Sequence, residues 1–172
     1  MQRGFSLIEL LMTLAIMAIV IVITVPAVEM FSQKSTADIL RSQLLRAIYL
    51  TRNAAMMQNT KALLCGSTNH QACLDQWQDG FSVVVKGKVF YTFQNLAVEG
   101  MLHWRAFPLH RSVLEFLPSG FPNAENGTFW FCSAKADRIV WAIMLNRSGR
   151  ARVVYPDAQG NIIDAKGAAL MC

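Results

Sequence analysis

The feature that most constrains the fold of this 172-residue chain is an uncharged apolar run near its N-terminus. From Leu10 to Val28 the sequence reads LLMTLAIMAIVIVITVPAV, with two threonines as its only hydroxyl groups. A helix rises about 1.5 Å per residue, so these residues match the roughly 30 Å hydrocarbon core of a bilayer. The run therefore predicts a membrane-spanning helical segment over about 9–28, which Pro26 loosens near its far end.

The flanks of the run help to decide between a cleaved signal peptide and a retained anchor. Arg3 is the only basic residue before the run, and the positive-inside rule then places the N-terminus in the cytoplasm. No small-residue cleavage site follows the run, which argues against an ordinary signal peptide. Glu9 stands at its start, where an acid either has a function or simply lies in the headgroup region at a helix N-terminus.

The first residues, MQRGFSLIELLMTLAIMAIVIVITVP, resemble the class III leader of type IV pilins and pseudopilins. The resemblance implies that prepilin peptidase removes residues 1–4 by cutting after Gly4, and that the new amine of Phe5 is methylated. Glu9 falls on the acidic residue of the family, and Pro26 on its helix-loosening proline. It also implies a single-pass subunit of the inner membrane with a periplasmic head. That subunit would later join other major and minor pilins, through its N-terminal helix, in a surface pilus.

Physical chemistry gives Glu9 an assembly role in such a filament. An unpaired carboxylate and an unpaired amine are each costly in an apolar core, whereas a pair of them is tolerated. Glu9 of one subunit is therefore expected to hold the Phe5 amine of a neighbour and to set the axial register.

Beyond the apolar run, small and apolar residues recur at helical spacing. This pattern predicts one long helix over 5–58, whose second half packs one face onto a globular head. The residues of this stripe are Ala37, Leu40, Leu44, Ala47, Ile48, Thr51, Ala54 and Ala55.

From residue 59 onward, short β-rich segments alternate with turn residues, which favours an antiparallel sandwich or barrel. The expected strands are 61–65, 81–86, 88–93, 101–107, 112–117, 128–132, 138–145 and 150–155, with a loop-rich end over 156–172. The predicted fold class is α+β, with a long N-terminal helix packed on an antiparallel β-sandwich head that spans 59–172.

The four cysteines allow three disulfide pairings. The export that the pilin resemblance implies would favour oxidation. Since two of the cysteines are close in sequence, the expected bonds are Cys65–Cys73 and Cys132–Cys172. The alternative is a metal site in Cys65-x4-His70-x2-Cys73, but a fourth ligand is not evident. No metal or cofactor is therefore expected.

The sequence of the predicted head narrows the resemblance to one group of pilin-like proteins. Three segments, LLRAIYLTRNAAMMQNTKALLC (44–65), NGTFWFC (126–132) and MLNRSGRARV (144–153), are similar to the GspH/FimT group. That group includes minor pseudopilins of type II secretion and the minor pilins FimU and FimT. The sequence Gly149-Arg150-Ala151-Arg152 matches the GRxR pattern associated with FimT, which is implicated in DNA binding during natural transformation. The resemblance is therefore nearest to FimT.

Positive charge gathers in the same region, where residues 135–152 contain five bases and one acid. Arg150 and Arg152 lie two apart on an expected strand, so their side chains share a face about 7 Å apart. Guanidinium groups suit phosphate, which they can hold bidentately. The predicted DNA contacts are Arg147, Gly149, Arg150 and Arg152, with Lys135 and Arg138 as outer contacts. The alternative is a solvated polar edge that resists aggregation.

Two classes of function follow. The first is a minor type IV pilin that binds extracellular double-stranded DNA, independently of sequence, for uptake in natural transformation. The second is a structural FimU- or GspH-like subunit that primes or caps a filament without binding DNA. No enzyme is expected, because the chain lacks a nucleophile elbow, a glycine-rich phosphate loop and an HExxH motif.

Overall fold

The computed structural model describes residues 7–67, 73–74, 76–94, 98–108, 111–123, 126–135, 137–164 and 167–172, with the backbone alone for 23–34. The leader residues Gly4 and Phe5 lie outside the described residues. By its internal contacts the chain forms two compact units, residues 1–36 and 37–172. The division falls inside the long helix, so each unit is described by itself.

The first unit holds the beginning of helix α1 (Leu7–Met57), which agrees with the predicted helix. Glu9 lies in its first turn, where negative charge is favourable. The apolar side chains between Leu7 and Val22 are largely exposed. Among the described residues, no helix has the length and hydropathy of a membrane span.

The second unit begins with the amphipathic half of α1. All eight residues of the predicted stripe are buried, with Leu44, Ala47, Ile48, Thr51 and Ala55 fully so. The helix ends in a Schellman motif, in which Thr60 N–H donates to the Ala55 carbonyl at 3.1 Å. Asn59 adopts the left-handed conformation (φ 46°) that such an ending requires, and asparagine tolerates it better than most residues.

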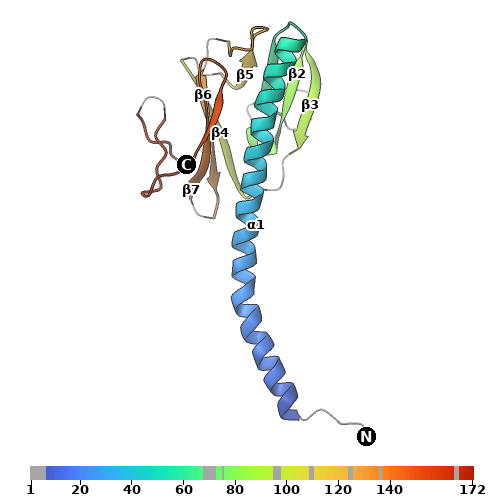
Figure 1. Cartoon of the computed structure of the whole chain (residues 1–172), viewed down its shortest axis with the longest axis vertical. Coiled ribbons are helices and arrows are strands. Elements are labelled where there is room, and N and C mark those ends of the chain that lie inside the picture. Colours follow the sequence, from blue (N-terminus) through green and yellow to red (C-terminus); the bar gives the residue numbers. More distant parts are fainter. Residues whose placement is uncertain are drawn as a thin grey trace. The chain divides into compact units, whose positions relative to one another are not determined.

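Eight strands form two antiparallel sheets of four strands in the described part of the head (Figure 1). One sheet has the order β3-β2-β1-β5 and the other β4-β6-β7-β8. The bounds are β1 (Ala62–Gly66), β2 (Gly80–Val85), β3 (Lys88–Gln94), β4 (Gly100–Phe107), β5 (Val113–Phe116), β6 (Asn126–Ser133), β7 (Arg138–Leu145) and β8 (Ala151–Val154). The α+β prediction, with antiparallel sheets in the head, is confirmed.

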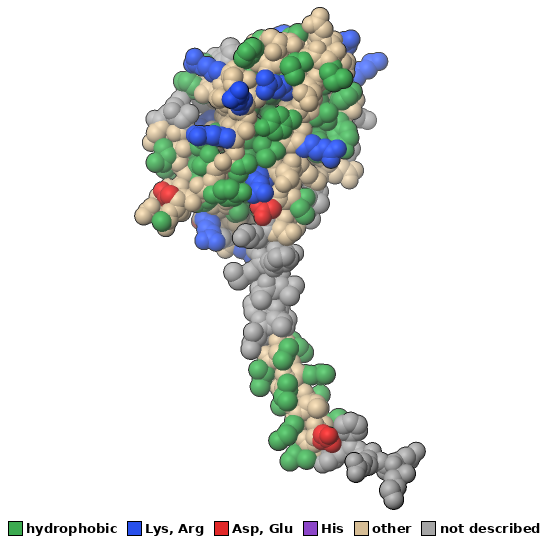
Figure 2. Space-filling view, in the orientation of Figure 1, with side chains coloured by type: hydrophobic (Ala, Val, Ile, Leu, Met, Phe, Trp, Pro, Cys, Tyr) green, Lys and Arg blue, Asp and Glu red, His purple; other side chains and the backbone are tan. Residues whose placement is uncertain are grey.

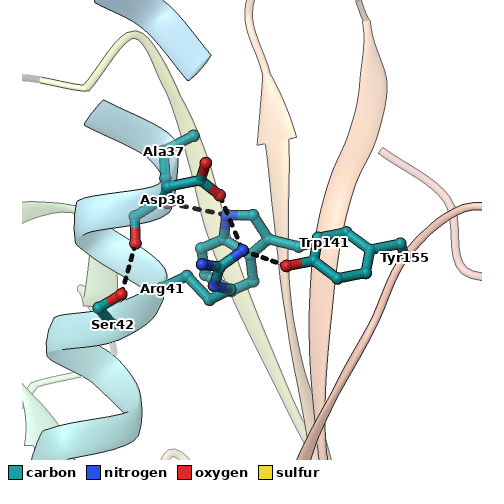
Figure 3. Close-up of polar contacts among 6 residues, drawn as sticks. All are labelled: Ala37, Asp38, Arg41, Ser42, Trp141 and Tyr155. Atoms are coloured by element: carbon teal, nitrogen blue, oxygen red, sulfur yellow. Dashed lines mark hydrogen bonds and ion pairs between the residues drawn. The ribbon is translucent and has the colours of Figure 1, made fainter. Parts of the chain in front are cut away.

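One face of each sheet and the stripe of α1 share a hydrophobic core. Trp141 on β7 is fully buried in it, and its indole N–H donates to the Ala37 carbonyl at 3.0 Å (Figure 3). Trp77, in the short 3₁₀ helix η1 (Trp77–Asp79), packs edge-on against Phe129, with 4.9 Å between ring centroids. Trp77 is thus part of the core of the head.

The C-terminal segment 156–172 covers the other face of the β4-β6-β7-β8 sheet. Ile162 and Leu170 are buried against Trp130 and Met144. The Trp130 indole N–H donates to the Met171 carbonyl at 3.0 Å. The segment contains turns and an isolated bridge instead of strands, as predicted.

Both expected disulfides are present in the structure. Cys65, at the end of β1, is bonded to Cys73, and Cys132 on β6 is bonded to Cys172. The second bond ties the C-terminal segment to the sheet that it covers. Both thiols of the alternative metal motif are therefore used in a disulfide, while its His70 lies outside the described residues.

Candidate nucleic-acid interface

The turn between β7 and β8, which carries the arginine motif, is organised by the side chain of Asn146. Its Oδ1 accepts hydrogen bonds from the backbone N–H of Ser148 at 3.1 Å and of Arg150 at 2.9 Å. The Ser148 hydroxyl donates to the same oxygen at 2.8 Å. In a tight turn, a side-chain oxygen that accepts several hydrogen bonds takes the place of backbone acceptors and fixes the shape of the turn. Arg147 therefore projects from an ordered turn.

Gly149 allows this turn to pack closely against the rest of the head. Its φ of +76° favours glycine, and a Cβ atom there would lie 2.9 Å from the Gly120 carbonyl oxygen and 3.2 Å from the Phe116 ring. The Gly149 carbonyl also accepts a hydrogen bond from Arg52 on α1 at 3.3 Å. The glycine of the GRxR pattern is thus required for close packing of the turn.

The three predicted arginines lie on or beside this turn, and all three are exposed. The predicted strand included Arg150, but β8 begins one residue later, at Ala151. Arg150 lies in the turn, where its backbone N–H donates to Asn146 Oδ1. Arg152 lies opposite Met144, with its guanidinium 3.7 Å from the thioether sulfur. Within the described residues none of the three arginines forms an ion pair with a carboxylate. Their charges are therefore available to an anion.

The structure separates the predicted outer contacts from this cluster. Lys135 and Arg138 lie at the turn between β6 and β7, at the opposite end of β7. A strand of this length spans about 23 Å, at about 3.3 Å per residue. Lys135 is also 3.4 Å from the carboxylate of Glu99. The five predicted bases therefore form two groups, one at each end of β7.

Side chains from one face of α1 contact β8 and its two ends. Arg41 interacts with the Tyr155 hydroxyl and with Asp38 (Figure 3), and the Tyr49 hydroxyl donates to the Ala151 carbonyl at 3.5 Å. Arg52 completes the row at Gly149. Sequence reasoning missed these supporting residues. Their helical spacing is visible in the sequence, but their partners are about a hundred residues away.

Near this end of the head, Glu115 on β5 has a pKa that its surroundings shift. Burial would raise its pKa, but hydrogen bonds from Lys61 and Asn123 and the charges of Lys61 and Arg111 together hold the pKa below its ordinary value. Lys61 Nζ lies 2.8 Å from the carboxylate. Glu115 is therefore an internal counterion of these bases and contributes little negative charge to the surface.

The comparisons with known proteins agree with both halves of this architecture. Residues 1–25 match the prokaryotic N-terminal methylation motif, and residues 41–149 match the family described as type II transport protein GspH. The chain belongs to the GspH family. Membership implies a pilin-like subunit that associates with other pilins, and pilins are structural proteins and not enzymes. The methylation motif implies processing by prepilin peptidase.

Solved structures share the fold of this GspH-family chain. A crystal structure of the type IV minor pilin FimU of Pseudomonas aeruginosa matches 73% of this chain and 90% of its own, at 16% identity and a TM-score of 0.51. A second crystal form of FimU matches 70% and 90%, at 16% identity and a TM-score of 0.48. No curated protein sequence gives a significant match. At this identity the similarity to FimU establishes a pilin-like fold.

Proposed function

We propose that this protein is a minor type IV pilin of the FimT kind. It binds extracellular double-stranded DNA through Arg147, Arg150 and Arg152, for uptake during natural transformation. The main supporting observation is the turn between β7 and β8, which holds these exposed arginines without a carboxylate partner in the described structure.

The geometry favours phosphate contacts over the reading of bases. A turn with one short strand offers no helix for the major groove, and phosphate contacts carry no sequence information directly. Binding is therefore nearly independent of sequence. If three phosphates are neutralised, log K falls against log salt with a slope of about −2.7, at roughly 0.9 per contact. Such a site binds weakly, at about micromolar Kd or poorer, so capture needs several contacts or subunits.

A titration of fluorescent duplexes with the full chain in neutral detergent tests the proposal. Replacing Arg150 and Arg152 together by Gln removes most of the binding to two unrelated sequences. The matched control replaces the same two residues by Lys, which keeps both charges and loses only the bidentate fork, so most binding is retained. Equal binding by wild type and the Gln variant, or no binding by either, would favour the structural subunit described next.

The second candidate function is a structural subunit that primes or caps a filament without binding DNA. The observations in its favour are the pilin-like fold shared with FimU and the exposed apolar side chains of α1 between Leu7 and Val22. Filament priming needs no phosphate site, so the DNA titration separates the two functions.

Both functions share the same processing and location. We place the cleavage between Gly4 and Phe5, with methylation of the Phe5 amine, as the match to the methylation motif supports. The subunit then waits in the inner membrane as a single-pass protein with a periplasmic head, before it enters the pilus. Intact-mass analysis of the protein from its native host tests the cleavage, and a mature chain that begins at Met1 contradicts it.

A further inference from the structure

Strand register brings a second basic turn to the same end of the head as the arginine turn. The strand residue Ala62 lies opposite Val85 on β2 and opposite Phe116 on β5. Lys61 therefore lies between the turn that joins β2 to β3 and the turn that follows β5. The tip of the first of these turns is Lys86-Gly87, and Lys88 is the first residue of β3.

The arginine turn completes this row of turns. An atom added at Gly149 would contact both Phe116 and Gly120, so the β7–β8 turn sits directly against the end of β5 and its following turn. From β3 to β5 there are three strand spacings, about 14 Å in all. A DNA duplex carries one charge per about 1.7 Å of its axis when both strands are counted. A length of duplex equal to this width therefore carries about eight phosphate charges on its two strands.

The Lys86-Gly87 turn has an unusual composition for its shape. Both residues have positive φ, 53° and 72°, as in a type I′ hairpin. Asn, Asp and Gly are favoured at such positions, and a lysine there is conformationally costly. Lys86 and Lys88 are exposed, and neither forms an ion pair with a carboxylate in the described structure. Lys86 thus places a base at a turn position where Asn, Asp or Gly would cost less, and Lys88 adds a second base at the start of β3.

The described loop residues at this end of the head, 58–61, 86–87, 117–123 and 146–150, include no Asp or Glu. Glu125, in the rest of the loop between β5 and β6, lies outside the described residues, and Glu115 on β5 is paired with Lys61. In Figure 2, Lys and Arg side chains are scattered over the upper half of the head on this face, among hydrophobic side chains, and no described acidic side chain is visible there. At the opposite end Glu99 and Asp137 accompany Lys135 and Arg138.

We propose that the DNA track crosses this end of the head, from Arg147 and Arg150 to Lys86 and Lys88. It does not follow β7 to Lys135 and Arg138. The inference rests on the proposed DNA-binding function and adds two phosphate contacts to it. Five contacts give a slope of log K against log salt of about −4.5, instead of about −2.7 for the three arginines alone.

The experiment compares two charge-matched double variants of the full chain in neutral detergent, titrated with one duplex at 50 and 200 mM salt. Lys86→Asn with Lys88→Gln removes two bases at the proposed track, and asparagine suits the turn. Lys135→Gln with Arg138→Gln removes two bases at the other end. Thermal melting checks that both variants remain folded.

Over this salt range the wild type loses about 500-fold in affinity, and the Lys86/Lys88 variant only about 40-fold, by the same counterion rule. The Lys135/Arg138 variant keeps the wild-type salt dependence. A wild-type slope in the Lys86/Lys88 variant, or equal reductions in both variants, overturns this track and leaves the arginine site standing. Absence of DNA binding by the wild type overturns the proposed function together with the track.

Discussion

Gly149 is the residue whose replacement most directly tests how the arginine turn is seated. A Cβ atom at this position adds a clash with the Gly120 carbonyl to the cost of a positive φ. We expect Gly149→Ala to lower the free energy of unfolding by about 2–3 kcal/mol, of which the conformational part is about 1–2 kcal/mol. Urea denaturation measures the difference. Gly160→Ala is the control, because Gly160 has a similar φ with open space around it and shows only the conformational part.

Glu115 makes the stability of the head depend on acid pH. Its folded-state pKa lies below the ordinary value of 4.5, so its ion pairs stabilise the fold fully above that value. The stabilisation is lost as pH falls through the lowered pKa. We expect Glu115→Gln to be less stable than wild type at pH 7, with a smaller further loss between pH 5 and pH 2. Thermal melts across this range measure it. The same loss of stability on acidification in both proteins would contradict this assignment, and Glu99→Gln is the exposed-acid control.

The residues of the arginine turn could be predicted from the sequence, but the residues that contact and support the turn could not. Arg150 and Arg152 are visible as a local pattern, and Gly149 completes that pattern. The contact of Arg52 with Gly149 joins residues 97 apart in sequence, and no local pattern encodes it. Burial of the α1 stripe was predictable, because helical periodicity is a property of the sequence itself.

The C-terminal segment is the part of the head whose attachment to its sheet depends most directly on a disulfide. The Cys132–Cys172 bond has a sequence separation of 40 residues, and the Cys65–Cys73 bond one of 8. In the chain-entropy model these contribute about 4 and about 2.5 kcal/mol. We expect Cys132→Ser with Cys172→Ser to destabilise the head more than Cys65→Ser with Cys73→Ser. Denaturation curves measure the order. Trp130 should also become more accessible to a fluorescence quencher in the first variant, because the segment covers its ring. A reversed order of stabilities would show that strain or local packing outweighs chain entropy.

The strand ranges were predictable because alternating apolar residues and turn residues mark each strand locally. Their pairing was not, since β1 lies between β2 and β5, and β4 pairs with β6. This pairing brings Lys86 and Lys88 to the arginine end, from about sixty residues earlier in the chain. Lys135 and Arg138 lie far from the arginines because the length of β7 separates them. A charge cluster in the sequence therefore does not show which bases share one end of the head.

For the whole molecule, the acid at the start of α1 gives the most informative variant. We expect Glu9→Ala to leave the head folded, because its core and disulfides lie within residues 37–172. Incorporation into filaments should fall several-fold, since the carboxylate can no longer pair with the Phe5 amine of a neighbour. Immunoblotting of purified pili against total membrane protein measures incorporation. Glu9→Asp is the charge-retaining control, and normal incorporation of the Ala variant would remove charge pairing from the account.

The row of contacts between α1 and β8 gives a route for force applied at the arginine turn. Arg52, Tyr49 and Arg41 attach one helix face at Gly149, Ala151 and Tyr155. A pull on a polymer held at the arginine turn therefore reaches the helix through several attachments along β8, which share the force. The same helix begins at Leu7. Tension can thus pass from the turn to the helix without first peeling open the β3-β2-β1-β5 sheet.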